Sequence, residues 1–170
     1  MHYEWLVKRK LTFPDLIKRI VAIIITIAIP FYILMAFKFN PKLFIIPVII
    51  LAALIYVTVI VFRRTNIEFE YIFAQDELRI DKIMNMTSRK NLENIEISKV
   101  ELVTYEGTDA YNEYENKDYE YDDYSSGLES ENKYYMYYRD DNGLTKIIFE
   151  PNEAILDQII KLAPRKVIKK

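Results

Sequence analysis

Two apolar runs near the N-terminus decide how this chain folds: Ile20–Phe37 (IVAIIITIAIPFYILMAF) and Leu43–Phe62 (LFIIPVIILAALIYVTVIVF). Neither run contains a charged side chain, and only residues 38–42 separate them. A helix of roughly 20 apolar residues crosses the hydrocarbon core of a bilayer. Because the bilayer core offers no water, backbone polar groups there must be bonded within the segment, which favours helix. The sequence therefore predicts a two-helix transmembrane hairpin at residues 16–64.

Basic side chains flank this hairpin at both ends. They are Lys8, Arg9, Lys10, Lys18 and Arg19 before the first run, and Arg63 and Arg64 after the second. The turn contains only Lys38 and Lys42. Since cytoplasmic flanks of membrane helices are enriched in Lys and Arg, both ends are predicted to be cytoplasmic. We expect a multi-pass protein of the plasma membrane with its N- and C-termini inside the cell.

A signal peptide is the alternative interpretation of the first run. The run is longer than a usual signal-peptide core, no small-x-small cleavage site follows it, and a second long run comes almost at once. These features favour a retained membrane helix.

The polar residues inside the spans are all uncharged. They are Thr26, Tyr32, Tyr56 and Thr58. Because charged residues usually mark transport paths, we expect these hydroxyls to bond to helix backbone or to lie near an interface. Alanines such as Ala22 and Ala52 permit close helix packing, so a homo-oligomer is a further expectation.

Residues 1–15 form a basic and aromatic leader before the hairpin. Trp5 with Lys8, Arg9 and Lys10 suits a segment that lies on an anionic inner leaflet. A simple flank that only sets the orientation is the alternative. Together with Arg63 and Arg64, these residues are the predicted membrane-surface contacts.

The charge of the chain is divided between its two parts. Residues 1–64 carry a net charge of +7 and residues 65–170 a net charge of −9, although the whole chain is only at −2. An acidic soluble domain argues against nucleic acid as a partner, because the negatively charged phosphates bind to positively charged protein surfaces.

The sequence offers little for catalysis. There is no cysteine, His2 is the only histidine, and the three glycines form no phosphate-binding or nucleophile-elbow motif. We therefore predict that the protein is not an enzyme and has no catalytic residues, no metal site and no cofactor.

After Arg64 the apolar residues recur with period two, which is typical of half-buried strands. The expected strands are 67–73, 77–84, 92–97, 99–105, 133–139 and 144–149. The sequence Asp140–Gly143 (DDNG) is a hairpin turn signal. Asn152 can cap an amphipathic helix that runs to about Leu162. Short turns between strands predict a curled antiparallel sheet, covered by this helix, in an α+β domain at 65–170.

The order of these segments resembles that of a known family. Two spans, "IEFEYIFAQDELRIDKI", "LENIEISKVELV" and "IIFEPNEAILDQIIKLAPRKV", together with the leader "EWLVKRK", resemble small uncharacterised bacterial two-helix membrane proteins. More remotely, the order is similar to bacterial membrane proteins with pleckstrin-homology-like domains. The resemblance covers most of the chain outside residues 106–132. It implies a PH-like split barrel capped by the C-terminal helix.

A lipid-binding PH domain would present a basic loop, and here the sequence departs from that pattern. Lys82, Arg89 and Lys90 are the only candidates in a domain with a net charge of −9. Phosphoinositide binding is therefore not expected.

Residues 106–132 form an acidic insert in which Lys117 is the only basic side chain. The insert has almost no aliphatic residues to bury, so a mobile, solvated loop is the default prediction. A protein-docking loop is the alternative, and its candidate contacts are Tyr111, Tyr114, Tyr119, Tyr121 and Tyr124.

Calcium binding by the insert is a second alternative. Asn116, Asp118 and Glu120 alternate as in an EF-hand loop, but Tyr121 stands where that loop needs glycine, and Gly127 where it needs glutamate. The EF-hand pattern therefore fails.

These observations predict a membrane-anchored cytoplasmic binding or scaffold module whose partners are the lipid bilayer and a protein. The alternative function is a small accessory subunit that contacts a larger membrane complex through its spans. A cation-responsive sensor that uses the acidic insert is a third hypothesis.

Overall fold

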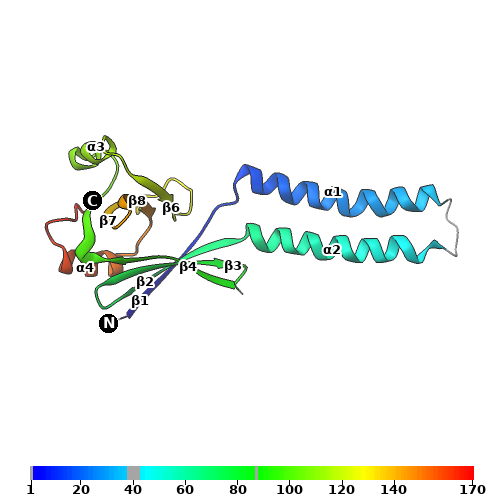
Figure 1. Ribbon diagram of the computed structural model, residues 1–170, viewed down its shortest axis with the longest axis horizontal. Helices are drawn as coiled ribbons and strands as arrows, with labels where there is room; N and C mark the ends of the chain where they lie inside the picture. The colour runs from blue at the N-terminus through cyan, green and yellow to red at the C-terminus, as the bar shows by residue number, and fades with distance from the viewer. Residues whose placement is uncertain (1, 38–42, 87) are drawn as a thin grey trace. The chain divides into compact units, whose positions relative to one another are not determined.

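The computed structural model describes residues 2–37, 43–86 and 88–170. The chain forms two compact units: Leu11–Asn66 is one, and Met1–Lys10 together with Ile67–Lys170 is the other. Figure 1 labels most of the elements of both units. The predicted turn at residues 38–42 lies outside the described residues.

The first unit is the predicted helical hairpin. Helices α1 (Phe13–Ala36) and α2 (Ile45–Thr65) lie side by side (Figure 1), and both are long and apolar enough to cross a membrane. The Thr26 and Thr58 hydroxyl oxygens are 2.6 Å apart, and the Thr26 hydroxyl donates to the Ala22 carbonyl at 2.7 Å. Threonine hydroxyls thus bond to helix backbone, as expected. Two such helices suggest that the protein associates with a membrane.

The second unit contains a first sheet whose strands are all antiparallel. Its order is β1 (His2–Lys8), β2 (Ile67–Ala74), β3 (Glu77–Met84) and β4 (Ser88–Glu96). Strand β1 precedes the helices in sequence, yet it pairs along its whole length with β2, which follows them.

Strand β1 corrects the prediction for residues 1–15. Residues 2–8 are an edge strand of this sheet and not a separate leader, and Val7, opposite Phe69, is buried in the core. The strand was missed because Trp5, Leu6 and Val7 form an unbroken apolar run without period-two alternation, and because its pairing partner lies far away in sequence.

The second sheet has the order β5 (Val100–Thr104), β7 (Tyr134–Asp140), β8 (Gly143–Phe149) and β6 (Glu120–Asp123). Strand β6 runs parallel to β8, whereas the other pairs are antiparallel. The short 3-10 helix η2 (Ile97–Lys99) joins the two sheets.

The DDNG hairpin is confirmed at the β7–β8 turn. The Asp140 carboxylate accepts hydrogen bonds from the backbone N–H groups of Asn142 and Gly143 at 2.8 and 3.2 Å. Such bonds from an aspartate to the next backbone amides stabilise tight turns.

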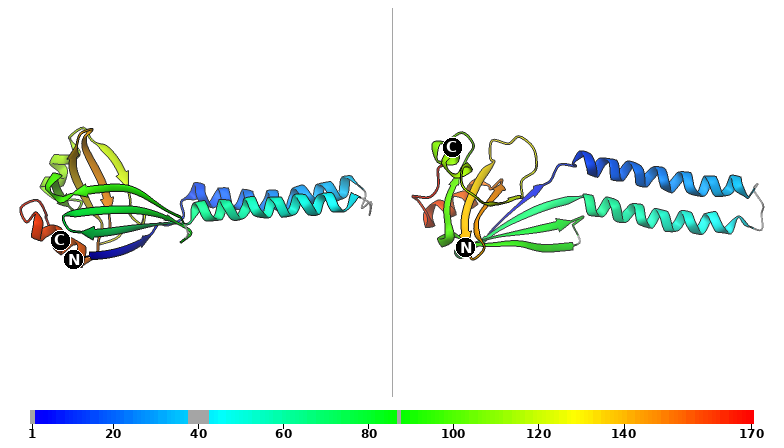
Figure 2. Two further views of the ribbon diagram at one scale, coloured as in Figure 1. Left: turned by 60° about the horizontal axis from the view of Figure 1, so that its bottom comes forward. Right: turned by 45° about the horizontal axis from the view of Figure 1, so that its top comes forward.

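The main core lies between the two sheets, which face each other in Figure 2. Helix α4 (Glu153–Leu162) adds Ile155, Leu156 and Ile159 to this core. The Asn152 side chain accepts from the Ile155 N–H at 2.9 Å, which confirms the predicted N-cap. The result is the expected α+β arrangement of curled sheets with a C-terminal helix.

Candidate functional site

The acidic insert is folded, which corrects the prediction of a mobile loop. It contains helix α3 (Asp109–Glu115) and strand β6, and Thr108 caps α3 by accepting from the Tyr111 N–H at 3.1 Å. The insert covers the outer face of the second sheet, where its tyrosines pack against Leu102, Leu144 and Ile148. The count of aliphatic residues was misleading because tyrosine rings supply the buried apolar area.

A buried lysine from β8 holds the insert in place. Lys146 is only 4% exposed and forms an ion pair with Glu115 at the end of α3. Its ammonium also lies 5.0–5.9 Å from the centroids of five tyrosine rings, a range suited to cation–π attraction. Those rings belong to Tyr111, Tyr119, Tyr121, Tyr135 and Tyr137. We call Lys146, Glu115 and these rings the lysine clasp.

Tyrosine hydroxyls complete the surroundings of Glu115. Tyr137 donates to one carboxylate oxygen at 2.7 Å and Tyr119 to the other at 3.1 Å. Burial by itself raises the pKa of Glu115. The bonds from Lys146 and Tyr137 together have a larger, opposite effect, so the pKa of Glu115 lies below its usual value. Burial lowers the pKa of Lys146, but the bond to Glu115, together with Tyr111 and Tyr119, raises it above the usual value. Both members of the pair are therefore charged near neutral pH.

The five tyrosines proposed for docking are mostly engaged within the chain. Tyr111 packs on Tyr135, with ring centroids 4.8 Å apart, while Tyr114 and Tyr119 pack on Tyr137 at 4.9 and 6.1 Å. These contacts bind the insert to the sheet beneath it.

Tyr124 and Tyr121 differ from the other three. Tyr124 lies between the sheets, where its ring contacts Phe69 and its hydroxyl donates to Glu93 at 3.1 Å. Tyr121 alone among the five is more than half exposed. The outward surface of the insert is therefore made mainly of carboxylates, and its exposed members are Glu106, Asp109, Glu113, Asp118, Glu120, Asp122, Asp123, Glu129 and Glu131.

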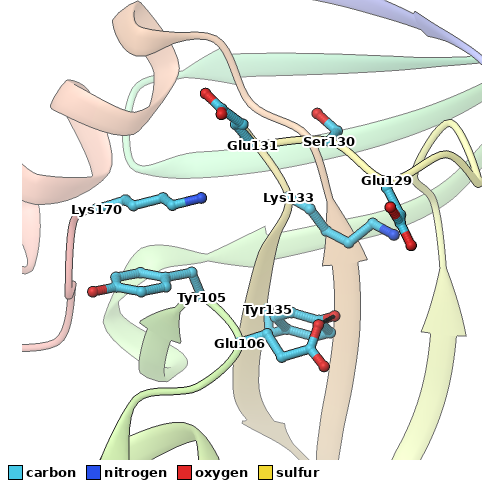
Figure 3. A pocket seen from close by; sticks show the side chains of 8 residues that line it. All are labelled: Tyr105, Glu106, Glu129, Ser130, Glu131, Lys133, Tyr135 and Lys170. Carbon is cyan, nitrogen blue, oxygen red and sulfur yellow. Dashed lines mark hydrogen bonds between the residues drawn. The ribbon is translucent and has the colours of Figure 1, made fainter.

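A polar cavity of about 360 Å³ lies beside the end of β5 (Figure 3). Tyr135 forms part of its wall and donates a hydrogen bond to Glu106 at 3.4 Å. Lys170 reaches in from the segment after α4. Both signs of charge line this cavity, which contains Tyr105, Glu106, Glu129, Ser130, Glu131, Lys133, Tyr135 and Lys170.

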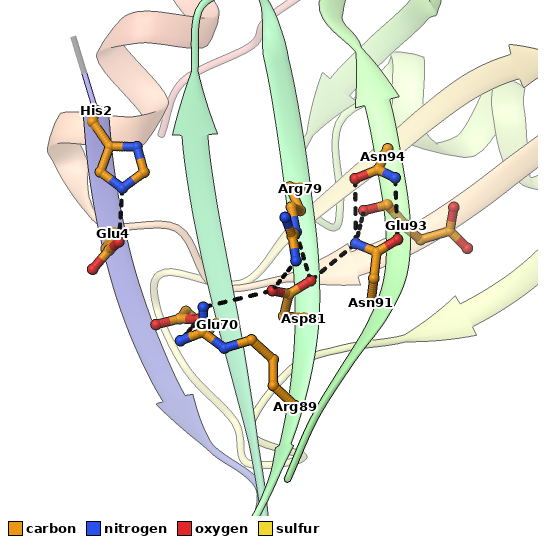
Figure 4. Close-up of polar contacts among 9 residues, drawn as sticks. All are labelled: His2, Glu4, Glu70, Arg79, Asp81, Arg89, Asn91, Glu93 and Asn94. Atoms are coloured by element: carbon orange, nitrogen blue, oxygen red, sulfur yellow. Dashed lines mark hydrogen bonds and ion pairs between the residues drawn. The ribbon is translucent and has the colours of Figure 1, made fainter. Parts of the chain in front are cut away.

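The outer face of the first sheet carries a second charged cluster (Figure 4). Glu70 and Asp81 are cross-strand partners and both are buried. Arg79 pairs with Asp81 at 2.8 Å and Arg89 with Glu70 at 2.6 Å, while Asn91 donates to Asp81 at 2.9 Å. Burial raises the pKa of Asp81, but the bonds from Arg79 and Asn91 lower it below the usual value. Arg89 was one of three candidates for the basic loop of a lipid-binding PH domain. Because it is paired with Glu70, fewer basic side chains are left for such a loop.

The predicted membrane-surface residues fall in different units. Trp5 and Lys8 lie on β1, where Trp5 is 43% exposed. The backbone N–H groups of Arg9 and Lys10 donate to the carbonyls of Ile67 and Ser126 at 3.0 and 2.7 Å. In the helical unit, Arg63 and Arg64 lie in the last turn of α2.

Of the residues considered for calcium, Asn116 caps the C-terminal end of α3 and Glu120 begins β6. In residues 2–37, 43–86 and 88–170, no group of three or more His, Cys, Asp or Glu side chains could hold a metal ion. The Asn116 side chain instead donates to the Asn112 carbonyl at 2.8 Å.

Comparison with known proteins identifies one family. A family model described as "Bacterial PH-like domain (DUF6106)" matches residues 1–169. The matched residues include β1 and both helices as well as the two sheets. No curated protein and no solved structure matches the chain.

Proposed function

The chain belongs to this bacterial PH-like family, and on that premise we propose that it is a membrane-anchored module that binds a protein partner at the cytoplasmic surface. A PH-like domain is a non-catalytic, binding type of fold. The surface that meets the partner is the folded acidic insert, and the partner presents a basic face to it.

The lysine clasp is the observation that carries this proposal. A spacer that only separates two strands has no need of a buried lysine, because burying an ion pair costs desolvation energy. The clasp instead fixes α3 and β6 on the sheet, with all of their carboxylates except that of Glu115 exposed. A surface that is ordered before binding avoids the entropy cost of ordering during binding.

The pairing of β1 with β2 supports the cytoplasmic placement. Because these strands precede and follow the helices and are hydrogen-bonded to each other, a membrane-inserted hairpin must begin and end on one side. The basic residues beside both ends then favour the cytoplasmic side.

Photo-crosslinking in native membranes tests the proposed partner surface. A photoreactive residue placed at Glu113, which is exposed on α3, should capture a discrete protein in the full-length chain. Combining this probe with Lys146→Met should reduce the captured amount at least threefold, because the insert loses its anchor.

The matched control is Lys161→Met, which makes the same chemical change at an exposed position of α4. It should leave capture unchanged. Equal capture by the wild type and Lys146→Met would show that a fixed insert is not needed, and the proposal would fail.

The accessory-subunit function is supported by a different observation. An apolar groove of about 290 Å³ lies between α1 and α2, and its lining includes Val21, Ile25, Leu54 and Val57. A third helix could fill such a groove within a membrane. Exchanging residues 11–66 for an unrelated two-helix hairpin distinguishes the two functions. Partner capture through Glu113 should survive the exchange in a binding module and be lost in an accessory subunit.

A further inference from the structure

Strand β5 is an edge strand of the second sheet, and its outer side is occupied by the chain itself. The Val103 N–H donates to the Lys166 carbonyl at 2.7 Å, and the Ile168 N–H donates to the Val103 carbonyl at 2.8 Å. Val103 and Val167 form an isolated parallel bridge. We call residues 165–170, which make this contact, the strap.

The strap places its side chains as an added strand would. Val167 packs against the core between the sheets, whereas Ile168 packs against the cluster on the outer face of the second sheet. Successive side chains of a strand point to opposite faces, so the strap extends the sheet at this point. The Lys166 ammonium adds a hydrogen bond to the Ser98 carbonyl at 3.0 Å.

Open space lies at both ends of this short pairing. A cavity of about 640 Å³ beside the start of β5 includes Glu101 and Lys166 in its lining. The cavity of about 360 Å³ beside the end of β5 includes Tyr105 and Lys170 (Figure 3). The strap thus pairs with the centre of the β5 edge and leaves a cavity on either side of that centre.

We infer that the β5 edge is a docking site for a basic, extended segment of another protein, and that the strap occupies this site as an internal substitute. Strand addition to a sheet edge is a recurrent mode of peptide recognition, in which backbone bonds give affinity and alternate side chains give specificity. Glu106, Glu129 and Glu131 of the insert line the cavity beside the end of β5, but the docking site is the β5 edge itself and not α3 or β6. It therefore adds a second binding surface to the proposed function.

The strap shows which chemistry the edge accepts. Its sequence, RKVIKK, has two branched apolar residues between pairs of basic ones. The apolar pair fits the two faces of β5, and the basic residues suit the rest of the domain, because residues 65–164 carry a net charge of −13. A partner that replaces the strap therefore carries the same order of basic, apolar, apolar and basic residues in an extended conformation.

The direct test measures binding of a fluorescent RKVIKK peptide to the full-length protein and to a variant that ends at Pro164, both in lipid nanodiscs. The variant without the strap should bind at least tenfold more tightly, because an attached strap competes at millimolar effective concentration. A peptide of equal charge, RKPPKK, should bind at least tenfold more weakly than RKVIKK, because proline has no backbone N–H to pair with β5.

A substitution in β5 tests whether the peptide binds through the backbone of this strand. In the shortened protein, Val103→Pro removes the N–H that bonds to the Lys166 carbonyl, and RKVIKK binding should fall at least tenfold. Proline is tolerated on an edge strand when the missing N–H faces outward. Equal binding of both peptides, or no gain on removing the strap from a folded protein, would overturn the inference.

A reversible disulfide between the strap and β5 provides a second test, which does not depend on the folding of the shortened protein. The chain has no cysteine, so a Val103→Cys, Val167→Cys pair introduces the only two thiols. The oxidised full-length protein should bind RKVIKK at least threefold more weakly than the same sample after reduction. Equal binding in the two states would contradict the inference. A disulfide that forms between two chains would instead assign the edge to a second copy, and would also overturn it.

Discussion

Lys8 and Glu68 are cross-strand partners in the first sheet, although α1 and α2 lie between them in sequence. The PH-like domain is therefore built from chain on both sides of the helical hairpin. Edge strand β1 completes the sheet and contributes Val7 to its core. The hairpin is an insertion into the domain, between its first and second strands.

This relationship predicts that the domain can be separated from the helices if β1 is kept. Replacing residues 11–66 by a short Gly/Ser linker between Lys10 and Ile67 should give a soluble, cooperatively folding protein. Residues 67–170 alone should unfold at least 10 °C lower or aggregate, because β2 loses its pairing with β1 and becomes an exposed edge. Thermal unfolding followed by circular dichroism measures the difference. Equal melting temperatures would show that β1 does not stabilise the sheet.

The same pairing predicts that positions 6 and 113 lie on one side of the membrane. Because the chain has no cysteine, Leu6→Cys and Glu113→Cys each provide a single thiol, and both positions are exposed. In intact cells an impermeant maleimide should label neither thiol, and it should label both after the cells are opened. Labelling of either position in intact cells would contradict the cytoplasmic orientation.

The lysine clasp predicts a specific order of stability among the wild type and two variants. Lys146→Met should destabilise the protein by about 1–3 kcal/mol, because it leaves the partly buried Glu115 carboxylate without its charged partner. Glu115→Leu combined with Lys146→Met should restore part of this loss, since an apolar pair can replace a buried ion pair. Denaturant unfolding of the linker-joined domain measures the three free energies. A double variant less stable than Lys146→Met would contradict the prediction.

The same pair predicts a window of pH in which the clasp is intact. The pKa of Glu115 is lowered by folding, so its contribution is present above its ordinary pKa and is lost as pH falls through the folded value. The pKa of Lys146 is raised, so its contribution is present below its ordinary pKa and is lost as pH rises through the folded value. Hydrogen exchange of residues 109–123 should therefore be slowest around neutral pH after correction for intrinsic rates. In a Glu115→Gln variant, the corrected exchange rate of these residues should no longer rise as the pH falls.

Asp81 gives an independent prediction on the opposite sheet. Asp81→Asn should cost about 1–3 kcal/mol at pH 7, because the buried carboxylate accepts bonds from Arg79 and Asn91. Folding lowers the pKa of Asp81, so its contribution is lost as pH falls through the folded value. The gap between wild type and variant should therefore shrink at pH 3. Urea unfolding at both pH values measures it, and a constant gap would rule out the charge of Asp81 as the cause.

Local sequence patterns determined most of the elements of this protein. Apolar runs without charge mark α1 and α2, because a bilayer core accepts no other composition. Period-two alternation marks β2 and β3, and Asn152 marks the start of α4. The family match to residues 1–169 confirms the PH-like resemblance that rested on these patterns.

Only the tertiary structure decided how distant segments combine. The pairing of β1 with β2, the folding of the insert over β8, and the contact of the strap with β5 each join residues that are far apart in sequence. Lys146 illustrates the reason. In the sequence it is one lysine in a strand, and only the approach of Glu115 and five tyrosines makes its burial favourable. The two apolar runs thus determined the membrane hairpin by local composition, whereas the candidate binding surfaces depend on contacts that exist only in the folded chain.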